Sequence, residues 1–197
     1  MKASILFIAA VLCCTGCKKI ADVIVDKATT IKPGQFTKFT IRSGQQYCDG
    51  NVYKTIDTDK LDFVVRFDSS AIYQNQSPEN QYDINKLFGF SDNGMDHHQF
   101  SARFGWRWSE GALRLFAYVY NEGKLISKEL TQVKIGEEIR CSITAGAGTY
   151  TFSAGDVQYR MPRSSVTEKA RGYQLYPYFG GDETAPHDIH IWIKLVE

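Results

Sequence analysis

Apolar and polar residues alternate with a period of two along most of the chain. The alternation recurs in about ten short segments bounded by turn-forming residues, which is typical of strands separated by turns. The segments are 36–42, 61–67, 98–108, 112–120, 124–130, 137–144, 149–154, 157–161, 173–179 and 187–196. Helical periodicity is scarce. We therefore predict an all-β fold, a two-sheet antiparallel β-sandwich of the jelly-roll kind.

Two short connections predict which strands pair. Ser-Glu-Gly at 109–111 joins the segments 98–108 and 112–120, and Asn-Glu-Gly-Lys at 121–124 leads into the next segment. Short connections that contain glycine favour hairpins, so these consecutive strands are expected to lie side by side.

Alternation also sorts the side chains of these strands onto two faces. The face expected to point inward carries Phe100, Ala102, Phe104, Trp106, Trp108, Leu113, Leu115, Ala117 and Val119. The opposite face carries Gln99, Ser101, Arg103, Arg107, Arg114, Phe116, Tyr118 and Tyr120. This second face is therefore expected to be both aromatic and cationic.

The aromatic and cationic face is a candidate carbohydrate-binding surface. Its candidate residues are Arg103, Arg107, Arg114, Tyr118 and Tyr120. Aromatic rings stack on sugar faces, and guanidinium groups bind carboxylates or sulfates at two points, so an acidic polysaccharide is the expected ligand. The alternative is a solvated face whose arginines pair with acidic residues on neighbouring strands, or a face covered by the N-terminal segment.

The same face could also support catalysis by a polysaccharide lyase, which cleaves a uronic-acid polymer by β-elimination. That reaction needs a group that neutralises the uronate carboxylate and a base that removes the adjacent proton. Arg103 with Gln99 is the candidate for the first role, and Tyr118 or His190 for the second.

The N-terminus predicts export and lipid anchoring. An apolar run at 5–14 follows Lys2 and has the length of a secretory signal. The Cys-Thr-Gly-Cys sequence that ends at Cys17 resembles a lipobox, with Cys14 where leucine is usual. We expect a signal peptide at 1–16, a lipidated tether at 17–34 and the sandwich at 35–197, held at the bacterial cell envelope through acyl chains on Cys17. The alternative is an ordinary signal peptide cut elsewhere, or a short hydrophobic helix.

Two of the five cysteines remain once the signal and the anchor are set aside, namely Cys48 and Cys141. In an oxidising envelope compartment an even pair is consistent with a disulfide. Cys141 also falls at an inward position of its strand, so buried free thiols are the equal alternative.

Charge and motif content argue against several other functions. The net charge is +1, so the chain lacks the basic excess expected of a nucleic-acid partner. The sequence 92–98 contains Asp92, Asp96, His97 and His98, but adjacent histidines on an extended chain point to opposite sides, so we predict a polar loop and no metal site. Asp182, Glu183 and Asp188 are weak candidates for Ca²⁺ ligands, without the spacing of an EF-hand.

The C-terminal sequence carries a family resemblance. The pattern YxLxPYFGG at 173–181, followed by a loop and a closing apolar strand, resembles the last part of concanavalin A-like jelly-roll domains of polysaccharide lyases, glycoside hydrolases and carbohydrate-binding modules. The sequences INKLFGFSD and SARFGWRW also resemble small uncharacterised lipoproteins of Bacteroidota. The ExDxxE arrangement of glycosidases and the RxExR, QIH and YFKxGxYxQ motifs of alginate lyases are missing, so the resemblance implies a fold and assigns no catalytic residue.

These observations favour a lipid-anchored envelope protein that binds an acidic polysaccharide. The first alternative is a polysaccharide lyase of the same fold. The second is a structural or protein-interaction lipoprotein without a glycan ligand.

Overall fold

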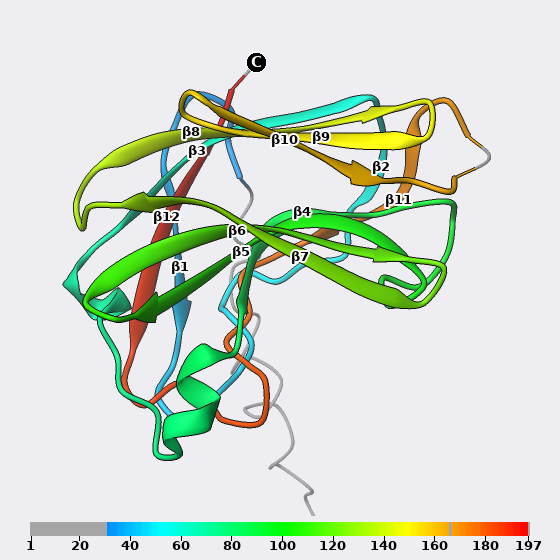
Figure 1. Cartoon of the computed structure of the whole chain (residues 1–197). Helices are drawn as coiled ribbons and strands as arrows, with labels where there is room; N and C mark the ends of the chain where they lie inside the picture. The colour runs from blue at the N-terminus through cyan, green and yellow to red at the C-terminus, as the bar shows by residue number, and fades with distance from the viewer. Residues whose placement is uncertain (1–30, 166, 197) are drawn as a thin grey trace, which may run out of the picture.

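The computed structural model describes residues 31–165 and 167–196, which form two antiparallel sheets packed face to face (Figure 1). The strands are β1 (Thr37–Ile41), β2 (Thr55–Thr58), β3 (Lys60–Phe67), β4 (Asn85–Ser91), β5 (Phe100–Ser109), β6 (Ala112–Asn121), β7 (Lys124–Val133), β8 (Glu138–Gly146), β9 (Thr149–Ala154), β10 (Val157–Pro162), β11 (Ala170–Leu175) and β12 (Ile189–Leu195). Two 3-10 helices, η1 (Ser69–Ala71) and η2 (Pro78–Tyr82), lie between β3 and β4.

In the described residues the first sheet has the strand order β1-β12-β3-β8-β9-β10, and the second has the order β2-β11-β4-β5-β6-β7. Figure 1 shows β8, β9 and β10 as one layer above the layer of β4, β5, β6 and β7. The predicted all-β, two-sheet antiparallel jelly-roll sandwich is confirmed.

The hairpins predicted around β6 are confirmed. The connections from β5 to β6 and from β6 to β7 each have two residues, Glu110–Gly111 and Glu122–Gly123, all with positive φ. Positive φ at both positions is the backbone of a type I′ turn, whose twist matches that of the paired strands. As a result Arg103 lies opposite Tyr118, and Arg107 lies opposite Arg114.

Three strand assignments differ from the sequence prediction. The strands β2 and β4 lie outside the alternating segments, and β4 is almost continuously buried, so it has no clear alternation. The predicted strand at 173–179 ends at Leu175 because Pro177 lacks the amide proton that a strand would need. The chain nevertheless continues beside β4, where Tyr178 forms a single bridge with Lys86.

The core between the sheets is rich in aromatic rings. Phe63 of the first sheet contacts Phe88 and Phe104 of the second edge to face, with ring centroids 5.2 and 5.6 Å apart. Seven of the nine predicted inward residues are fully buried, namely Ala102, Phe104, Trp106, Leu113, Leu115, Ala117 and Val119, whereas Phe100 and Trp108 are partly buried. Burial of this face fixes the opposite side of β5 and β6 as the outer surface of the second sheet.

Cys48 and Cys141 are free and buried in the structure, so no disulfide joins them. Cys141 lies on β8 with its side chain in the core, and Cys48 lies beside Ile41 of β1. Burial raises the pKa of the Cys48 thiol to about 12 and raises that of Cys141 as well. Both residues are therefore small apolar parts of the core, which is the alternative that the sequence left open.

The predicted signal peptide, Cys17 and most of the tether lie outside the described residues. The described end of the tether contacts the sandwich, since Ile31 packs against the core and Gly34 donates its amide proton to the Leu195 carbonyl, 3.1 Å away. Within the described ranges, no helix is both long enough and apolar enough to cross a membrane.

A tyrosine-lined cleft around Arg103

A cleft of about 490 Å³ opens on the outer face of the second sheet. Strands β4, β5, β6 and β11 form its floor, the turn after β4 forms one side, and the connection between β1 and β2 forms a wall. Its lining residues are Tyr47, Asn51, Val52, Tyr53, Lys86, His97, His98, Arg103, Tyr118, Tyr120, Tyr173, Gln174, Leu175, Tyr176, Pro177, Tyr178 and Gly181. This composition combines many tyrosines with two cations.

Arg103 lies at the centre of the floor and is only 6 % exposed. Its Nε is buried without a hydrogen-bond partner, and no ion pair among the described residues includes it. Tyr118, directly opposite on β6, places its ring 5.4 Å from the guanidinium carbon. Burial lowers the pKa of Arg103 to about 10, so the group is charged at neutral pH. The cleft therefore holds a buried cation whose partner is not another described side chain.

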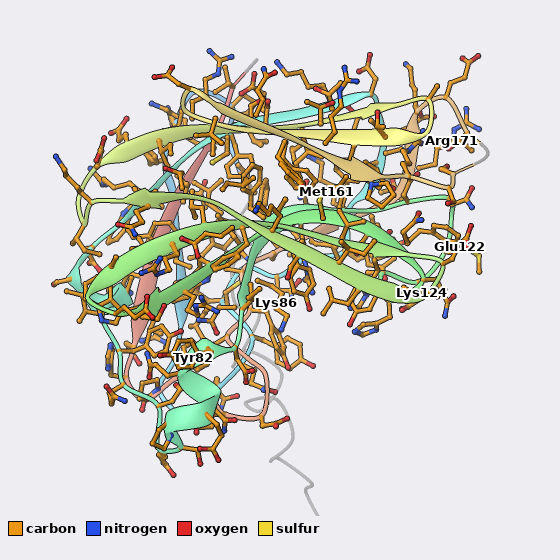
Figure 2. The ribbon with its side chains drawn as sticks, in the orientation of Figure 1. Tyr82, Lys86, Glu122, Lys124, Met161 and Arg171 are labelled. Carbon is orange, nitrogen blue, oxygen red and sulfur yellow. The ribbon has the colours of Figure 1, made fainter. Side chains whose placement is uncertain are left out.

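Lys86 supplies a second cation from β4. Its ammonium donates to the Gly180 carbonyl at 2.9 Å and lies 5.5 Å from the Tyr118 ring centre. Figure 2 shows Lys86 on the side of the second sheet that is turned away from the first. Burial and the neighbouring Arg103 charge lower the pKa of Lys86 to about 8. Two like charges held together in a half-buried cleft favour an anionic ligand.

Tyr118 and Tyr120 line the cleft as predicted. Their ring centres are 6.0 Å apart, and the two ring planes are inclined by 67°. Burial, and then the neighbouring Tyr120, raise the pKa of Tyr118 to about 12, so its hydroxyl is protonated at neutral pH. The Tyr118 hydroxyl is consequently a proton donor in the resting cleft.

His97 and His98 line the cleft as well, which the alternation of the sequence does not predict. They lie in a tight turn held by Asp96, so their rings stack with centroids 4.1 Å apart instead of pointing to opposite sides. The Nδ1 of His97 is 2.8 Å from the Tyr173 hydroxyl. Burial lowers the pKa of His97, and the His98 and Arg103 charges lower it further. His97 is therefore a neutral imidazole near pH 7.

The donor atoms of Asp96, His97 and His98 lie within 4.8 Å of one another. Among the described residues this is the one cluster with the donor types of a metal site, and it contradicts the prediction that the histidines diverge. The carboxylate and the two adjacent imidazoles come from one turn at the cleft rim, where Asp96 and His98 are exposed and His97 is partly buried.

Arg107 and Arg114 share the outer face but lie beyond the cleft, which corrects the prediction of one continuous site. The Nη1 of Arg107 donates to the Tyr82 carbonyl at 2.7 Å. Arg114 forms ion pairs with Glu129 at 2.8 Å and with Glu110 at 2.7 Å. Arg114 thus pairs with acidic residues, as the alternative for this face expected, whereas Arg107 is bound by a backbone carbonyl.

Gln99 and His190 do not reach the cleft either. Gln99 lies beside the turn of the β6–β7 hairpin, where its carbonyl accepts the Gly123 amide proton at 3.1 Å. His190 faces outward as predicted, but β12 belongs to the first sheet, and its ring contacts Thr40. Gln174 of β11 and His97 line the cleft together with Arg103 instead.

Two of the three Ca²⁺ candidates, Glu183 and Asp188, have other partners. The carboxylate of Glu183 accepts the backbone amide protons of Gln76 and Ser77, each at 2.8 Å. The carboxylate of Asp188 accepts the Ser43 amide proton at 2.9 Å and pairs with Arg42. These two carboxylates therefore fix surface loops, and the arrangement gives no support to a Ca²⁺ site.

A buried ion pair anchors the turn that carries His97. Asp92 and Arg163 are fully buried, and the Arg163 Nε donates to the Asp92 carboxylate at 2.9 Å. The Tyr150 hydroxyl donates to the same oxygen at 2.6 Å, and the Arg171 amide donates to the other. Tyr150 lies on β9 of the first sheet, and Arg163 directly follows β10 of the same sheet. Asp92 therefore ties one edge of the cleft to the opposite layer.

Comparison with known proteins supports the fold. No protein-family model and no curated protein sequence matches the chain. Among solved structures, the alginate lyase AlyC3 has a TM-score of 0.56 and 12% identity, over 80% of this chain and 72% of the other. The marine alginate lyase AlyA1 of polysaccharide lyase family 7, from Zobellia galactanivorans, has a TM-score of 0.52 and 13% identity, over 87% and 80%. At these identities the similarity shows a shared jelly-roll fold.

Proposed function

We propose that the cleft binds an acidic polysaccharide and that Arg103 receives a uronate carboxylate. The observation that carries this proposal is the unpaired, buried guanidinium of Arg103. Burying a charge is costly unless it is paired, and a guanidinium matches the two oxygens of a carboxylate. A ligand carboxylate would supply the partner that the described side chains do not provide.

The tyrosines favour a sugar as the carrier of this carboxylate. Tyrosine offers a flat apolar face for a sugar ring and a hydroxyl that bonds to sugar oxygens. The cleft is also open, as an extended polymer requires. The two solved structures compared above are both alginate lyases, and alginate is a polyuronate. A polyuronate is therefore the first ligand to test.

Calorimetric titration of the purified protein with a polyuronate and with a neutral polysaccharide tests the proposal. We expect binding of the polyuronate alone, and loss of that binding in Arg103→Met. Arg107→Met is the matched control, because it removes an arginine from the same face outside the cleft. Equal binding by Arg103→Met and the parent protein would disprove the assignment.

A second candidate function, cleavage of the same polymer by β-elimination, is favoured by His97. This neutral imidazole lines the same cleft as Arg103 and Tyr118. With the carboxylate neutralised by Arg103, His97 would remove the proton on the carbon beside it. The electron pair would form the ring double bond, the glycosidic C–O bond would break, and Tyr118 would protonate the departing oxygen.

The elimination product contains a conjugated double bond, so ultraviolet absorbance during incubation with polyuronate separates this candidate from simple binding. Activity that His97→Gln and Tyr118→Phe each abolish, with binding retained, would support the lyase. Binding without any new absorbance would leave a carbohydrate-binding protein. A well-folded protein that binds no glycan would instead indicate a structural or protein-interaction role.

The proposed setting of this site is the bacterial cell envelope, with the sandwich anchored by acyl chains on Cys17. The support is the lipobox-like sequence that ends at Cys17. Mass spectrometry of the protein purified from membranes should show an N-terminal peptide that starts at an acylated Cys17. An unmodified Cys17 that follows other residues would disprove the anchor.

A further inference from the structure

Tyr53 and Tyr173 form a ridge between two hollows on the outer face. Both residues line the Arg103 cleft, and both also line a second hollow of about 490 Å³. Their ring centres are 5.7 Å apart and the ring planes are inclined by 32°. The two hollows are therefore neighbours that share one aromatic pair.

The exposure of Tyr53 has no evident role in stability. Its side chain is 79 % exposed, so it buries little apolar surface in the folded protein. The backbone beside it is nevertheless fixed, because the Lys54 carbonyl accepts the Gln174 amide proton at 2.8 Å, next to Tyr173 on β11. A large ring held in water by an ordered backbone is a preorganised binding surface.

The second hollow continues away from Arg103 along β2 and β11. It is lined by Tyr53, Thr55, Ile56, Asp57, Gly94, Met95, Asp96, Arg171, Gly172 and Tyr173. Arg171 pairs with Asp57 at 3.3 Å, and both side chains are more than half exposed. Figure 2 shows Arg171 near the end of the sandwich, well separated from Lys86. The hollow thus offers polar and charged groups beyond the aromatic ridge.

We infer that the Tyr53–Tyr173 ridge is an outer sugar subsite, over which an acidic polysaccharide passes from the Arg103 cleft into the second hollow. This inference rests on the proposed function. The affinity of the protein would then depend on the length of the oligosaccharide. A short one occupies the Arg103 cleft alone, and a longer one also covers the exposed Tyr53 ring.

Calorimetric titration with uronate oligomers of increasing length, from the dimer upward, tests the inference. In the parent protein the affinity should rise with length until the ridge is covered. Tyr53→Ala should weaken binding of the longest oligomers about fivefold more than it weakens binding of the dimer, the value of one aromatic contact. Tyr53→Phe keeps the ring and should restore the parent profile.

Tyr159→Ala is the matched control, since Tyr159 is an exposed tyrosine on β10 of the other sheet. Its length profile should equal that of the parent protein. If Tyr53→Ala shows the parent profile, or loses the same factor at every length, the outer subsite is disproved while the Arg103 site stands. If the parent protein binds no oligomer of any length, the proposed function fails and the subsite with it.

Discussion

Gly89 of β4 lies directly opposite Arg103 of β5, and the missing side chain of the glycine leaves the space that the arginine stem occupies. A Cβ atom at position 89 would fall well inside van der Waals contact with the Ala102 carbonyl and the Arg103 backbone. The glycine thus allows the two strands to pair closely beneath the cleft.

Gly89→Ala should therefore separate β4 from β5 and displace Arg103. Overpacking of a buried position costs about 1–3 kcal/mol, which chemical denaturation would measure, and polyuronate binding should fall in parallel. The control is Gly146→Ala on β8, where a Cβ would meet only ordinary contacts of 3.6 Å or more. Parent-like stability and binding in Gly89→Ala would contradict this account of the cleft floor.

Arg103→Met should lose binding without losing stability. The folded protein carries the desolvation penalty of an unpaired guanidinium, and an apolar side chain of similar length removes it. We expect a free energy of unfolding equal to that of the parent, or about 1 kcal/mol higher. Thermal unfolding measures the difference. A loss of several kcal/mol would indicate that Arg103 has a structural partner and would weaken its role as a ligand group.

Polyuronate affinity should fall as the pH rises from about 7 to about 9, since the pKa of Lys86 is about 8. The fold lowers this pKa from its usual 10.5 by burial and by the Arg103 charge, partly offset by Asp83. The ammonium is charged below that pKa and neutral above it, whereas Arg103 keeps its charge until about pH 10. Lys86→Met should bind more weakly at pH 7 and show a flat profile over this interval. A parent profile that is also flat would rule out Lys86 as an anion-binding group.

The alternation of the sequence predicts faces well and positions along a strand poorly. Arg103 and Tyr118 are brought together because one two-residue hairpin fixes their register, which is a local property. Lys86 and Tyr173 come from β4 and β11, whose pairing joins residues far apart in the chain and leaves no local signal. Alternation also cannot tell which of the two sheets a strand joins, which is why the outward-facing His190 was placed in the wrong site.

Asp92→Asn should be the most destabilising single change near the cleft. The Asp92 carboxylate is fully buried and accepts hydrogen bonds from Arg163, Tyr150 and two backbone amides. Asparagine would keep one acceptor oxygen but would turn an NH₂ group toward the Arg163 and Tyr150 donors. Removal of one partner of a buried ion pair leaves an uncompensated charge and costs about 3–5 kcal/mol.

Urea denaturation should rank three variants and so separate this network from ordinary contacts. Tyr150→Phe removes one hydrogen bond from the same carboxylate and should cost about 1–2 kcal/mol, less than Asp92→Asn. Asp57→Asn breaks the exposed pair with Arg171 and should cost under about 1 kcal/mol. Because Asp92 holds the turn that positions His97, Asp92→Asn should also weaken polyuronate binding at urea concentrations where the protein is still folded. If Asp92→Asn is as stable as Asp57→Asn, the two sheets are held together without the ion pair between Asp92 and Arg163.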